Sequence, residues 1–400
     1  MTDIEENISI DNDDTTYILQ ICHCYYDPFL DCARQFSAIF KGTKYRIVTV
    51  FMTGEPDDAV AKAADSDEVI FLGHSSKKLR GLKLQVIREI HQIAKQYPFE
   101  FCIAHRAKSA YVGLLATKLP IYSIRHSFGD FDRASRRWMI NRFQHRVTIL
   151  AVSNAVRDEI RLNLSHWPAE QIVTFYNHLD VEKVRNELLP RSLAREALKL
   201  SDTAWVVGSV GRLHPDKDPK TLIRGFALAL ERLPEQSLLV MIGTGRLENE
   251  LKKLIHSLGI ENNVLLLGKI PLARQYFNAF DCFVLASDHE PFGMVLLEAM
   301  AANLPIISSD CGGAPEVVGD TGLLFKLGDA DELADKIAEL ANGENKPKSL
   351  TQQRLENYFS DESAKHTFFS QILKSDCFAI LQPELKQKVT TALTKLHQDY

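Results

Sequence analysis

The sequence predicts an α/β fold made of two Rossmann-like domains whose parallel sheets face a central cleft. Apolar runs of strand length alternate with segments of helical periodicity through most of the chain, which is typical of parallel sheets covered by helices. The runs form two series joined near residues 180–200, and the 400 residues suffice for two domains with full cores. Ligands of such sheets bind outside the carboxyl ends of the strands, so we expect functional residues there.

The first series contains six runs with the length and composition of buried strands. Between the third and the fourth run, residues 83–96 carry apolar side chains at helical spacing, so we expect a helix there. Ser153 follows the sixth run and can cap the next helix through its hydroxyl. The expected strands are residues 16–21, 45–50, 68–72, 101–104, 121–124 and 148–152.

The second series opens on residues 204–210, a run typical of a fully buried strand. It continues with the same alternation of strand and helix up to residue 340. The expected strands are residues 204–210, 238–242, 264–267, 282–285, 305–307 and 323–325, and the expected helices are 219–233, 247–258, 292–302 and 329–340.

These patterns define four segments. We expect a disordered lead-in over residues 1–14, an N-terminal domain over 15–185, and a C-terminal domain over 200–345. Residues 350–400 carry two further helices, 350–373 and 384–396, of which we expect the first to cross back to the N-terminal domain.

Composition excludes several classes of protein. The net charge of −5 and the pI of about 6.2 argue against the overall basic character of a nucleic-acid-binding protein. The apolar runs are shorter than the roughly 18 residues that span a bilayer, and the acidic start is unlike a signal peptide. Seven scattered cysteines fit reduced thiols better than a disulfide framework, so we expect a cytoplasmic protein. The Cys22-His23-Cys24 triplet lacks a second pair at zinc-finger spacing, which favours ordinary strand residues over a metal site.

Two acids eight residues apart, Glu290 and Glu298, are the most informative feature of the chain. Pro291-Phe292-Gly293 between them would open a helix whose first N–H groups are unpaired and attract phosphate. Carboxylates on both sides of a phosphate-binding turn suit a ligand with hydroxyls at both ends and a diphosphate in the middle. A nucleotide sugar has this chemistry.

Two further loops follow strands of the second series. Arg212 and Lys217 lie just after the strand at 204–210, where two cations can hold a diphosphate and neutralise it as it leaves. A solvated turn with a helix-flanking lysine is the alternative. The Gly243-x-Gly245 turn lacks the third glycine of a dinucleotide fingerprint, because residue 248 is Glu, but it still permits close backbone approach to a nucleotide.

The order of these motifs resembles the retaining glycosyltransferases of family 4, which have the GT-B fold. The block from Glu290 to Pro305 looks like that family's signature of two glutamates separated by seven residues, and residues 310–318 resemble the block that follows it. The resemblance covers residues 200–342 closely and 100–185 more loosely. Within that family, the sequence resembles the bacterial glycosyltransferases that build lipopolysaccharide core and other cell-surface polysaccharides.

The resemblance implies a role for each matching residue. Arg212 and Lys217 would contact the donor diphosphate, Glu298 the ribose and Glu290 the sugar hydroxyls. The remaining donor-site residues would be Gly243 and Gly245, the backbone N–H groups of Phe292 and Gly293, and Lys269 and Ile270 near the base.

In the N-terminal half, His126 looks like the family's strand-end histidine, which faces the donor sugar and the acceptor. A structural histidine is the alternative. His105 ends the preceding strand and would line the same cleft. The resemblance also has a departure, because Cys22-His23-Cys24 stands where many members have a Gly-Gly loop near the donor phosphates.

The resemblance implies sugar transfer from a UDP- or GDP-sugar, with retention at the anomeric carbon and no cofactor. Retention by two displacements needs a carboxylate nucleophile, and none is evident once Glu290 binds hydroxyls. We therefore expect a same-face mechanism, with His126, Arg212, Lys217 and Glu290 as the catalytic residues. The triplets 130–132 and 216–218 contain two aspartates each. The first lies in a basic stretch and the second brackets Lys217, so neither is typical of a metal site, and we expect no metal.

The acceptor is less well defined. Six arginines between residues 125 and 146, interleaved with aromatic residues, could face anionic lipid or a phosphorylated saccharide, with Arg136 and Arg137 on the acceptor or membrane side. An ordinary solvated basic face is equally consistent. We favour a saccharide or glycolipid acceptor and peripheral contact with the cytoplasmic face of the inner membrane. A sugar phosphorylase, a soluble-sugar transferase and an inactive sugar-nucleotide-binding homologue remain as alternatives.

Overall fold

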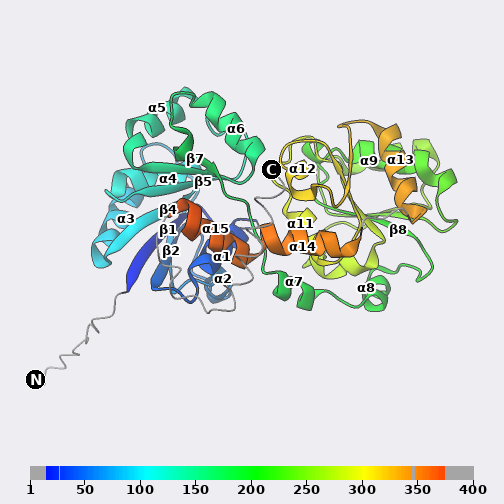
Figure 1. The fold of residues 1–400 in the computed structure, drawn as a ribbon, viewed down its shortest axis with the longest axis horizontal. Coiled ribbons are helices and arrows are strands. Elements are labelled where there is room, and N and C mark those ends of the chain that lie inside the picture. Colours follow the sequence, from blue (N-terminus) through cyan, green and yellow to red (C-terminus); the bar gives the residue numbers. More distant parts are fainter. Residues whose placement is uncertain (1–14, 27, 344–346, 374–400) are drawn as a thin grey trace, which may run out of the picture. The chain divides into compact units, whose positions relative to one another are not determined.

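The computed structural model describes residues 15–26, 28–343 and 347–373, and it contains two parallel sheets covered by helices (Figure 1). The first sheet has seven strands in the order β3-β2-β1-β4-β5-β6-β7. The second has six strands in the order β10-β9-β8-β11-β12-β13. In each sheet the strands are added outward on one side of the first strand of the series, and the following strands are then added on its other side. The predicted α/β fold with two Rossmann-like sheets is confirmed.

Six of the seven strands of the first sheet correspond to the first predicted series, but the seventh, a short strand at residues 172–174, was not predicted. β1 lies between β2 and β4, with Ile18 opposite Ile47 on one side and Phe101 on the other, and all three residues are buried. The strands are β1 (Thr16–Cys22), β2 (Tyr45–Thr53), β3 (Glu68–His74), β4 (Phe99–His105), β5 (Ile121–Arg125), β6 (Val147–Ala151) and β7 (Ile172–Thr174).

Helices connect these strands, and their ends follow local chemistry. Ser153 caps α6 as predicted, because its hydroxyl accepts a hydrogen bond of 3.1 Å from the Val156 amide. The helices are α1 (Phe29–Phe40), α2 (Asp58–Ala64), α3 (Leu84–Gln96), α4 (Arg106–Ala116), α5 (Ala134–Arg142) and α6 (Asn154–Asn163), with 3-10 turns η1 (Gln144–Arg146) and η2 (Ala169–Gln171).

The second sheet has a core of aliphatic and aromatic side chains. Helices α9 and α13 lie side by side over it (Figure 1), and Leu222, Phe226 and Leu333 from these helices are buried. The strands are β8 (Val206–Val210), β9 (Leu238–Ile242), β10 (Val264–Leu266), β11 (Cys282–Leu285), β12 (Ile306–Ser309) and β13 (Leu323–Phe325). The helices are α7 (Val181–Glu187), α8 (Arg191–Leu198), α9 (Pro219–Ala229), α10 (Glu248–Leu258), α11 (Met294–Ala301), α12 (Ala314–Val318) and α13 (Ala330–Ala341), with 3-10 turns η3 (Pro215–Lys217), η4 (Leu230–Arg232) and η5 (Ala273–Ala279).

Two helix predictions need correction. α11 begins at Met294 instead of residue 292, so Glu298 lies about one turn into the helix instead of two. The single helix predicted over 350–373 is wrong: α14 (Lys348–Phe359) ends at Ser360, and α15 (Asp361–Thr367) and a π-helical turn (Phe368–Ile372) follow. Ser360 is extended because it pairs with Leu179 in an isolated bridge and caps α15 with its hydroxyl. The predicted lead-in 1–14 and helix 384–396 lie outside the described residues.

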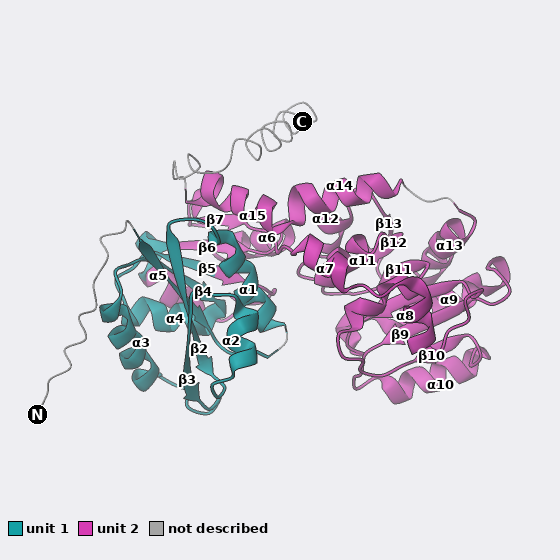
Figure 2. Cartoon of the chain, turned by 90° about the horizontal axis from the view of Figure 1, so that it is seen from below, with its two compact units in different colours: residues 1–123, 143–147 teal, residues 124–142, 148–400 magenta. Residues whose placement is uncertain are grey.

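The chain divides into two compact units (Figure 2), residues 1–123 with 143–147 and residues 124–142 with 148–400. Strands β1–β7 all precede residue 175, and strands β8–β13 all follow residue 205. The predicted domain borders stay predictions. In the second unit, α15 contacts the segment after β7, where the His178 ring hydrogen-bonds the Asp361 carboxylate at 2.6 Å.

Arg195 joins α8 to the amino ends of β8 and β11 in the second sheet. Its guanidinium is buried and donates to the carbonyls of Ala279 and Ala204 at 3.1 and 2.9 Å and to the Asp281 carboxylate at 2.9 Å. Asp281 also accepts the Val206 amide at 2.7 Å, at the start of β8. Arg191 binds the same carboxylate at 2.6 Å, but 45% of its side chain is exposed.

Replacing Arg195 by Ala should lower the free energy of unfolding by about 3–5 kcal/mol, because it removes a buried guanidinium and leaves the carbonyls of Ala279 and Ala204 without their donor. Arg191→Ala is the matched control on the same carboxylate and should cost at most about 1 kcal/mol, as for exposed ion pairs. Denaturant titration of both variants measures the difference. Equal losses would show that Arg195 has no special role in the fold.

Candidate functional site

The loop after β8 carries the predicted phosphate-binding cations. Gly211, Arg212 and Lys217 line a hollow at the carboxyl ends of β8 and β9, together with Met241 and Leu285 of neighbouring strands. The loop closes with the 3-10 turn η3, which ends at Lys217 just before α9. The structure thus places both cations at the edge of the sheet where ligands of parallel sheets bind.

Lys217 and Glu290 form a direct ion pair. The Lys217 ammonium lies 2.6 Å from the Glu290 carboxylate, whose side chain is only 9% exposed. The Ser287 hydroxyl donates to the same carboxylate oxygen at 3.3 Å. β8 and β11, which lead into the two loops, are neighbours in the sheet, and this brings together residues 73 positions apart. The pair brings together two residues with different predicted roles, because the family resemblance implies that Lys217 contacts the donor diphosphate and Glu290 the sugar hydroxyls.

Asp216 organises the cationic loop from within. Its carboxylate accepts a hydrogen bond of 2.8 Å from Arg212 and another from the His214 ring. Burial alone would raise the pKa of Asp216, but the His214 hydrogen bond and the charges of Arg212 and Lys217 outweigh it and hold this pKa below its usual range. Asp218 accepts the Thr221 amide at 3.3 Å and caps α9. Both aspartates of this triplet therefore have structural partners.

The glycines of the turn after β9 serve loop packing. A Cβ on Gly243, whose φ is +142°, would lie 1.8 Å from the Gly211 carbonyl oxygen. The Gly243 amide also donates to the Gly268 carbonyl at 2.7 Å, which places Lys269 and Ile270 directly after this contact. A larger residue at 243 would separate the loops after β8, β9 and β10.

The loop that carries Glu290 is held by the segment after β12. The Gly313 amide donates to the Glu290 carbonyl at 2.8 Å, and the Ser309 hydroxyl donates to the Ser287 carbonyl at 2.6 Å. A Cβ on Gly312, whose φ is +62°, would lie 2.2 Å from the Glu290 carbonyl oxygen, so only glycine fits. The block at 310–318 thus fixes the backbone of the candidate site.

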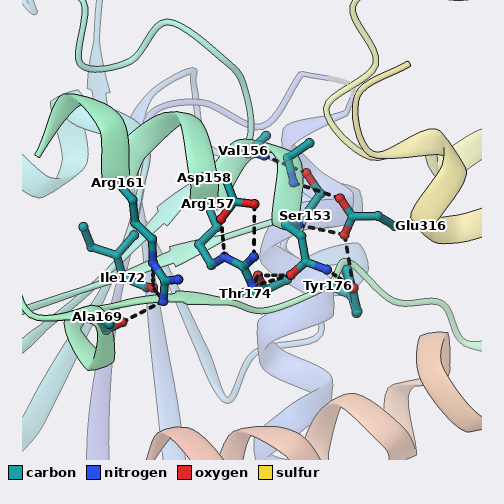
Figure 3. A network of polar contacts seen from close by, with 12 residues as sticks. Ser153, Val156, Arg157, Asp158, Arg161, Ala169, Ile172, Thr174, Tyr176 and Glu316 are labelled. Carbon is teal, nitrogen blue, oxygen red and sulfur yellow. Dashed lines mark hydrogen bonds and ion pairs between the residues drawn. The ribbon is translucent and has the colours of Figure 1, made fainter. Parts of the chain in front are cut away.

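Figure 3 shows what this block does at its other end. The Glu316 carboxylate accepts the backbone amides of Asn154 and Ala155 at 2.7 and 2.8 Å, in the first turn of α6. The Tyr176 hydroxyl donates to it at 3.1 Å. Burial, followed by the charge of Glu316 and this hydrogen bond, raises the pKa of Tyr176. A carboxylate at a helix N-terminus also interacts favourably with the helix dipole, so Glu316 joins α12 to α6.

The other predicted donor residues lie on the same elements. Glu298 is partly buried on α11, and Gly293 directly precedes that helix. The Phe292 ring is buried against the rings of Tyr176 and Phe359, at centroid distances of 6.0 and 5.7 Å. Phe292 therefore anchors the loop, which leaves only its backbone for a ligand.

The two predicted histidines differ in their surroundings. His126 follows β5 and is partly exposed, as a strand-end residue in contact with ligand would be. His105 is 4% exposed; its ring hydrogen-bonds the Gln20 side chain at 3.1 Å and packs on Phe36 at 5.1 Å. In this structure, His105 contacts core residues. The roles assigned to both histidines stay predictions.

The side chains that stand in place of the Gly-Gly loop after β1 are buried or half-buried. Cys22 and Cys24 are buried, and burial raises the pKa of each thiol. Burial, followed by the charges of Lys108 and Arg106, lowers the pKa of His23 to about 4. Within the described residues, no group of three or more His, Cys, Asp or Glu side chains has the arrangement of a metal site.

The arginine-rich stretch between 125 and 146 is largely bonded to itself. Arg136 donates to the Asp130 carboxylate at 3.0 Å, and Arg125 donates to the same carboxylate at 3.3 Å. Arg137 donates to the Asp132 carbonyl at 2.8 Å. These contacts fold residues 130–132 onto α5, which gives Arg136 and Arg137 a structural role. Their predicted role at the acceptor or membrane side stays a prediction.

Sequence reasoning missed the residues that connect the elements. Glu316 was noted only as part of the block at 310–318, and Tyr176 and His178 were assigned no role. His178 is buried and its ring hydrogen-bonds the Asp361 carboxylate, a contact between distant segments that the sequence does not signal.

Solved structures with this architecture are GT-B glycosyltransferases. A glycosyltransferase from Rickettsia africae has a TM-score of 0.75 at 17% identity, covering 92% of this chain and 100% of its own. Anabaena HepE in complex with UDP-glucose has a TM-score of 0.72 at 20% identity, covering 90% and 100%. The apo form of the lipopolysaccharide outer core galactosyltransferase WaaB has a TM-score of 0.67 at 20% identity, covering 90% and 99%. The protein has the GT-B fold.

Family models identify the two halves of the chain. The model of glycosyl transferases group 1 matches residues 190–356, and that of Glycosyltransferase Family 4 matches residues 34–183. The chain thus carries a family 4 glycosyltransferase domain in its N-terminal half and a group 1 glycosyl transferase domain in its C-terminal half.

Curated relatives match over part of their length. An N-acetyl-alpha-D-glucosaminyl L-malate synthase from Bacillus anthracis is 29% identical over 236 residues, which are 57% of this chain and 60% of that protein. The capsular polysaccharide biosynthesis glycosyltransferase CapM from Staphylococcus aureus is 28% identical over 221 residues, 54% and 58% of the two chains. The matched segments thus span six-tenths or less of these relatives. None of the helices that the structure describes is long and apolar enough to cross a bilayer.

Glu316→Ala should lower the free energy of unfolding by about 2–3 kcal/mol, since it removes charge-assisted bonds to two amides and one hydroxyl. Amide exchange of Asn154 and Ala155 should accelerate in the same variant. The control is Glu182→Ala, an exposed acid in the first turn of α7, which should cost no more than about 1 kcal/mol. Unchanged amide exchange in Glu316→Ala would show that the carboxylate does not cap α6.

Stability should fall as pH drops from about 6.5 toward 4, in part because of His23. Its pKa is about 4 in the folded protein and near 6.5 in the unfolded chain, so the unfolded chain binds the proton first. His23→Gln should flatten the dependence of the unfolding free energy on pH in this window. Curves of equal slope for both proteins, from denaturant titrations across the window, would contradict the buried neutral His23.

Proposed function

We propose that this protein is a retaining, metal-independent glycosyltransferase that moves a sugar from a nucleotide-sugar donor to a saccharide or glycolipid acceptor. The observation that carries the proposal is the Lys217–Glu290 ion pair of 2.6 Å at the carboxyl edge of the second sheet. One cation and one buried acid stand together, and we propose that the donor's diphosphate and sugar would meet there. The two family models that match the halves of the chain support the same class of reaction.

Lys217 would stabilise the departing diphosphate. An ammonium group has three donors, so Lys217 can keep its bond to Glu290 and still bind a phosphate oxygen. Glu290 is held by Lys217 and Ser287, and it would accept hydrogen bonds from hydroxyls of the donor sugar. Arg212, with 68% of its side chain exposed, would turn from Asp216 to the second phosphate. Negative charge on the leaving group is greatest in the transition state, so this arrangement favours it over the ground state.

The partners of Glu290 support a same-face mechanism. A double displacement needs a carboxylate that is free to attack the anomeric carbon. The Glu290 carboxylate is instead engaged by an ammonium and a hydroxyl, which lowers its nucleophilicity. The leaving diphosphate, oriented by Lys217 and Arg212, would then accept the proton of the acceptor hydroxyl. His126 would lie on the acceptor side of the reacting sugar.

Metal independence rests on how the two aspartate pairs are used. Asp130 is engaged by Arg125 and Arg136, and Asp216 by Arg212 and His214. Asp218 caps α9. Cations of the chain therefore already pair with one carboxylate of each triplet, and we propose that Arg212 and Lys217 supply the charge that a divalent ion gives elsewhere.

Relatives and structural neighbours support the substrate class. HepE was solved with UDP-glucose, and CapM and WaaB are named for capsular polysaccharide and for lipopolysaccharide outer core. We propose a UDP- or GDP-sugar as donor, and the synthesis of lipopolysaccharide core or another cell-surface glycan as the process. The protein would then act in the cytoplasm, on the cytoplasmic face of the inner membrane. Glu298 would bind the nucleotide ribose, and Lys269 and Ile270 would lie near the base.

The test begins with thermal stabilisation by a panel of nucleoside diphosphates and nucleotide sugars, with and without a chelator. A ligand of the folded state raises the melting temperature by mass action, so the true donor should stand out, and the chelator should change nothing. Turnover of the selected donor is then compared with that of Lys217→Ala. This variant should lose about 100-fold or more in kcat with a much smaller change in KM, as for lost transition-state stabilisation.

Lys220→Ala is the matched control, because Lys220 lies one turn away and pairs with Glu250 at 2.7 Å on an exposed surface. It should keep wild-type turnover. No stabilisation by any nucleotide would refute the transferase, and a chelator-sensitive donor shift would refute metal independence. A loss in Lys217→Ala confined to KM would remove the leaving-group role.

A further inference from the structure

Residues 75–88 form the most cationic segment that the described part of the first unit presents to solvent. They contain five Lys or Arg and no Asp or Glu, in a chain whose net charge is −5. The segment runs from the end of β3 into the first turns of α3, which is drawn in cyan in Figure 1. Two leucines in the same segment, Leu82 and Leu84, are each 68% exposed. We call residues 75–88 the basic-leucine segment.

The segment is a fixed structure that holds its leucines outward. Leu79 and Val86 are both 1% exposed and anchor it to the core. Between them, the Tyr111 hydroxyl of α4 donates to the Leu82 carbonyl at 3.3 Å. The Lys83 ammonium lies 4.6 Å from the centre of the Tyr111 ring and donates to the Gly81 carbonyl at 2.7 Å. Leu82 and Leu84 flank this pinned residue, so their exposure follows from the fold of the loop.

The cations of the segment are available to a ligand. Lys77, Lys78, Arg80 and Arg88 are exposed, and none of them takes part in an ion pair given for the described residues. The nearest acid on α3, Glu89, already binds His74 at 2.6 Å and Gln85 at 3.0 Å. Lys108 of α4 is also exposed, so the positive surface continues onto α4.

We infer that the basic-leucine segment docks on an anionic lipid bilayer, with Leu82 and Leu84 entering the acyl boundary and the cations contacting headgroup phosphates. A bilayer surface is complementary to both features, because amphipathic segments bind through buried apolar side chains together with attraction to anionic lipid. A soluble polyanion would use the cations but not the leucines. Lysine and arginine stems can lie along the apolar boundary while their charges reach the phosphates.

This inference deepens the proposed function and rests on it for its biological meaning, since a glycolipid acceptor lies in a membrane. It assigns the membrane contact to residues 75–88 instead of the arginine-rich stretch, whose Arg125, Arg136 and Arg137 are bonded to residues 130–132. The binding test uses no sugar donor. Failure of the membrane contact and failure of transferase activity are therefore separate results.

The experiment is sedimentation of the full chain with phosphatidylcholine vesicles, with and without phosphatidylglycerol. Wild-type protein should pellet only with the anionic vesicles. The double variant Leu82→Ser/Leu84→Ser should bind about tenfold more weakly or less, given the transfer free energy of a leucine side chain. Lys77→Glu/Lys78→Glu should weaken binding by about fivefold or more for each cation lost. A Leu82→Trp variant should shift its fluorescence to shorter wavelength on the same vesicles.

Two controls match these variants in kind. Leu162→Ser changes an 82% exposed leucine on α6, and Lys62→Glu changes an exposed lysine on α2; both should bind like wild type. All variants should keep the melting temperature and the nucleotide response of the wild type, because the changed side chains are on the surface. Equal pelleting with both vesicle types, no pelleting, or leucine variants that bind as wild type does would overturn the inference. The last result would indicate a surface for soluble polyanions.

Discussion

The candidate site depends on the segment between Cys311 and Glu316, which holds one loop by its backbone and one helix by its side chain. At one end, Gly312 and Gly313 hold the Glu290 carbonyl. At the other end, the Glu316 carboxylate caps α6, with bonds to residues 162 and 161 positions away in the sequence. The backbone of Glu290 and the first turn of α6 are therefore both bonded to the same short segment.

The charges of the site are balanced before any ligand arrives. Lys217 is paired with Glu290, and Arg212 is paired with Asp216. This pairing keeps both cations at the edge of the sheet, where a free lysine or arginine would sample many rotamers. Groups that are already oriented need little reorganisation when charge develops on a leaving group, which is the usual source of electrostatic catalysis. The same pairing also reduces the free energy gained on ligand binding, because a phosphate must compete with the carboxylates that already bind these cations.

The sequence predicted what depends on local pattern. The predicted strands were right to within three residues at each end, because buried parallel strands are continuous apolar runs; only the three-residue strand β7 was missed among the described strands. Lys217 could meet Glu290 because both follow adjacent strands. Contacts between distant segments left no local signal. Ser360 breaks a helical pattern only because Leu179 pairs with it. Glu316 reads as an ordinary helical acid until α6 is placed against it.

The two basic segments show why a count of charges does not define a surface. Arginines between 125 and 146 have neighbouring acids and carbonyls within reach, and a guanidinium with five donors satisfies several of them at once. Residues 75–88 contain no acid, and Glu89, which follows them, is already bonded to His74 and Gln85. Leu79 then decides the outcome: because it is the leucine that packs inward, the turn that follows presents Leu82 to solvent. The distinction between a structural and a binding cluster thus comes from packing, which the pattern of charges does not contain.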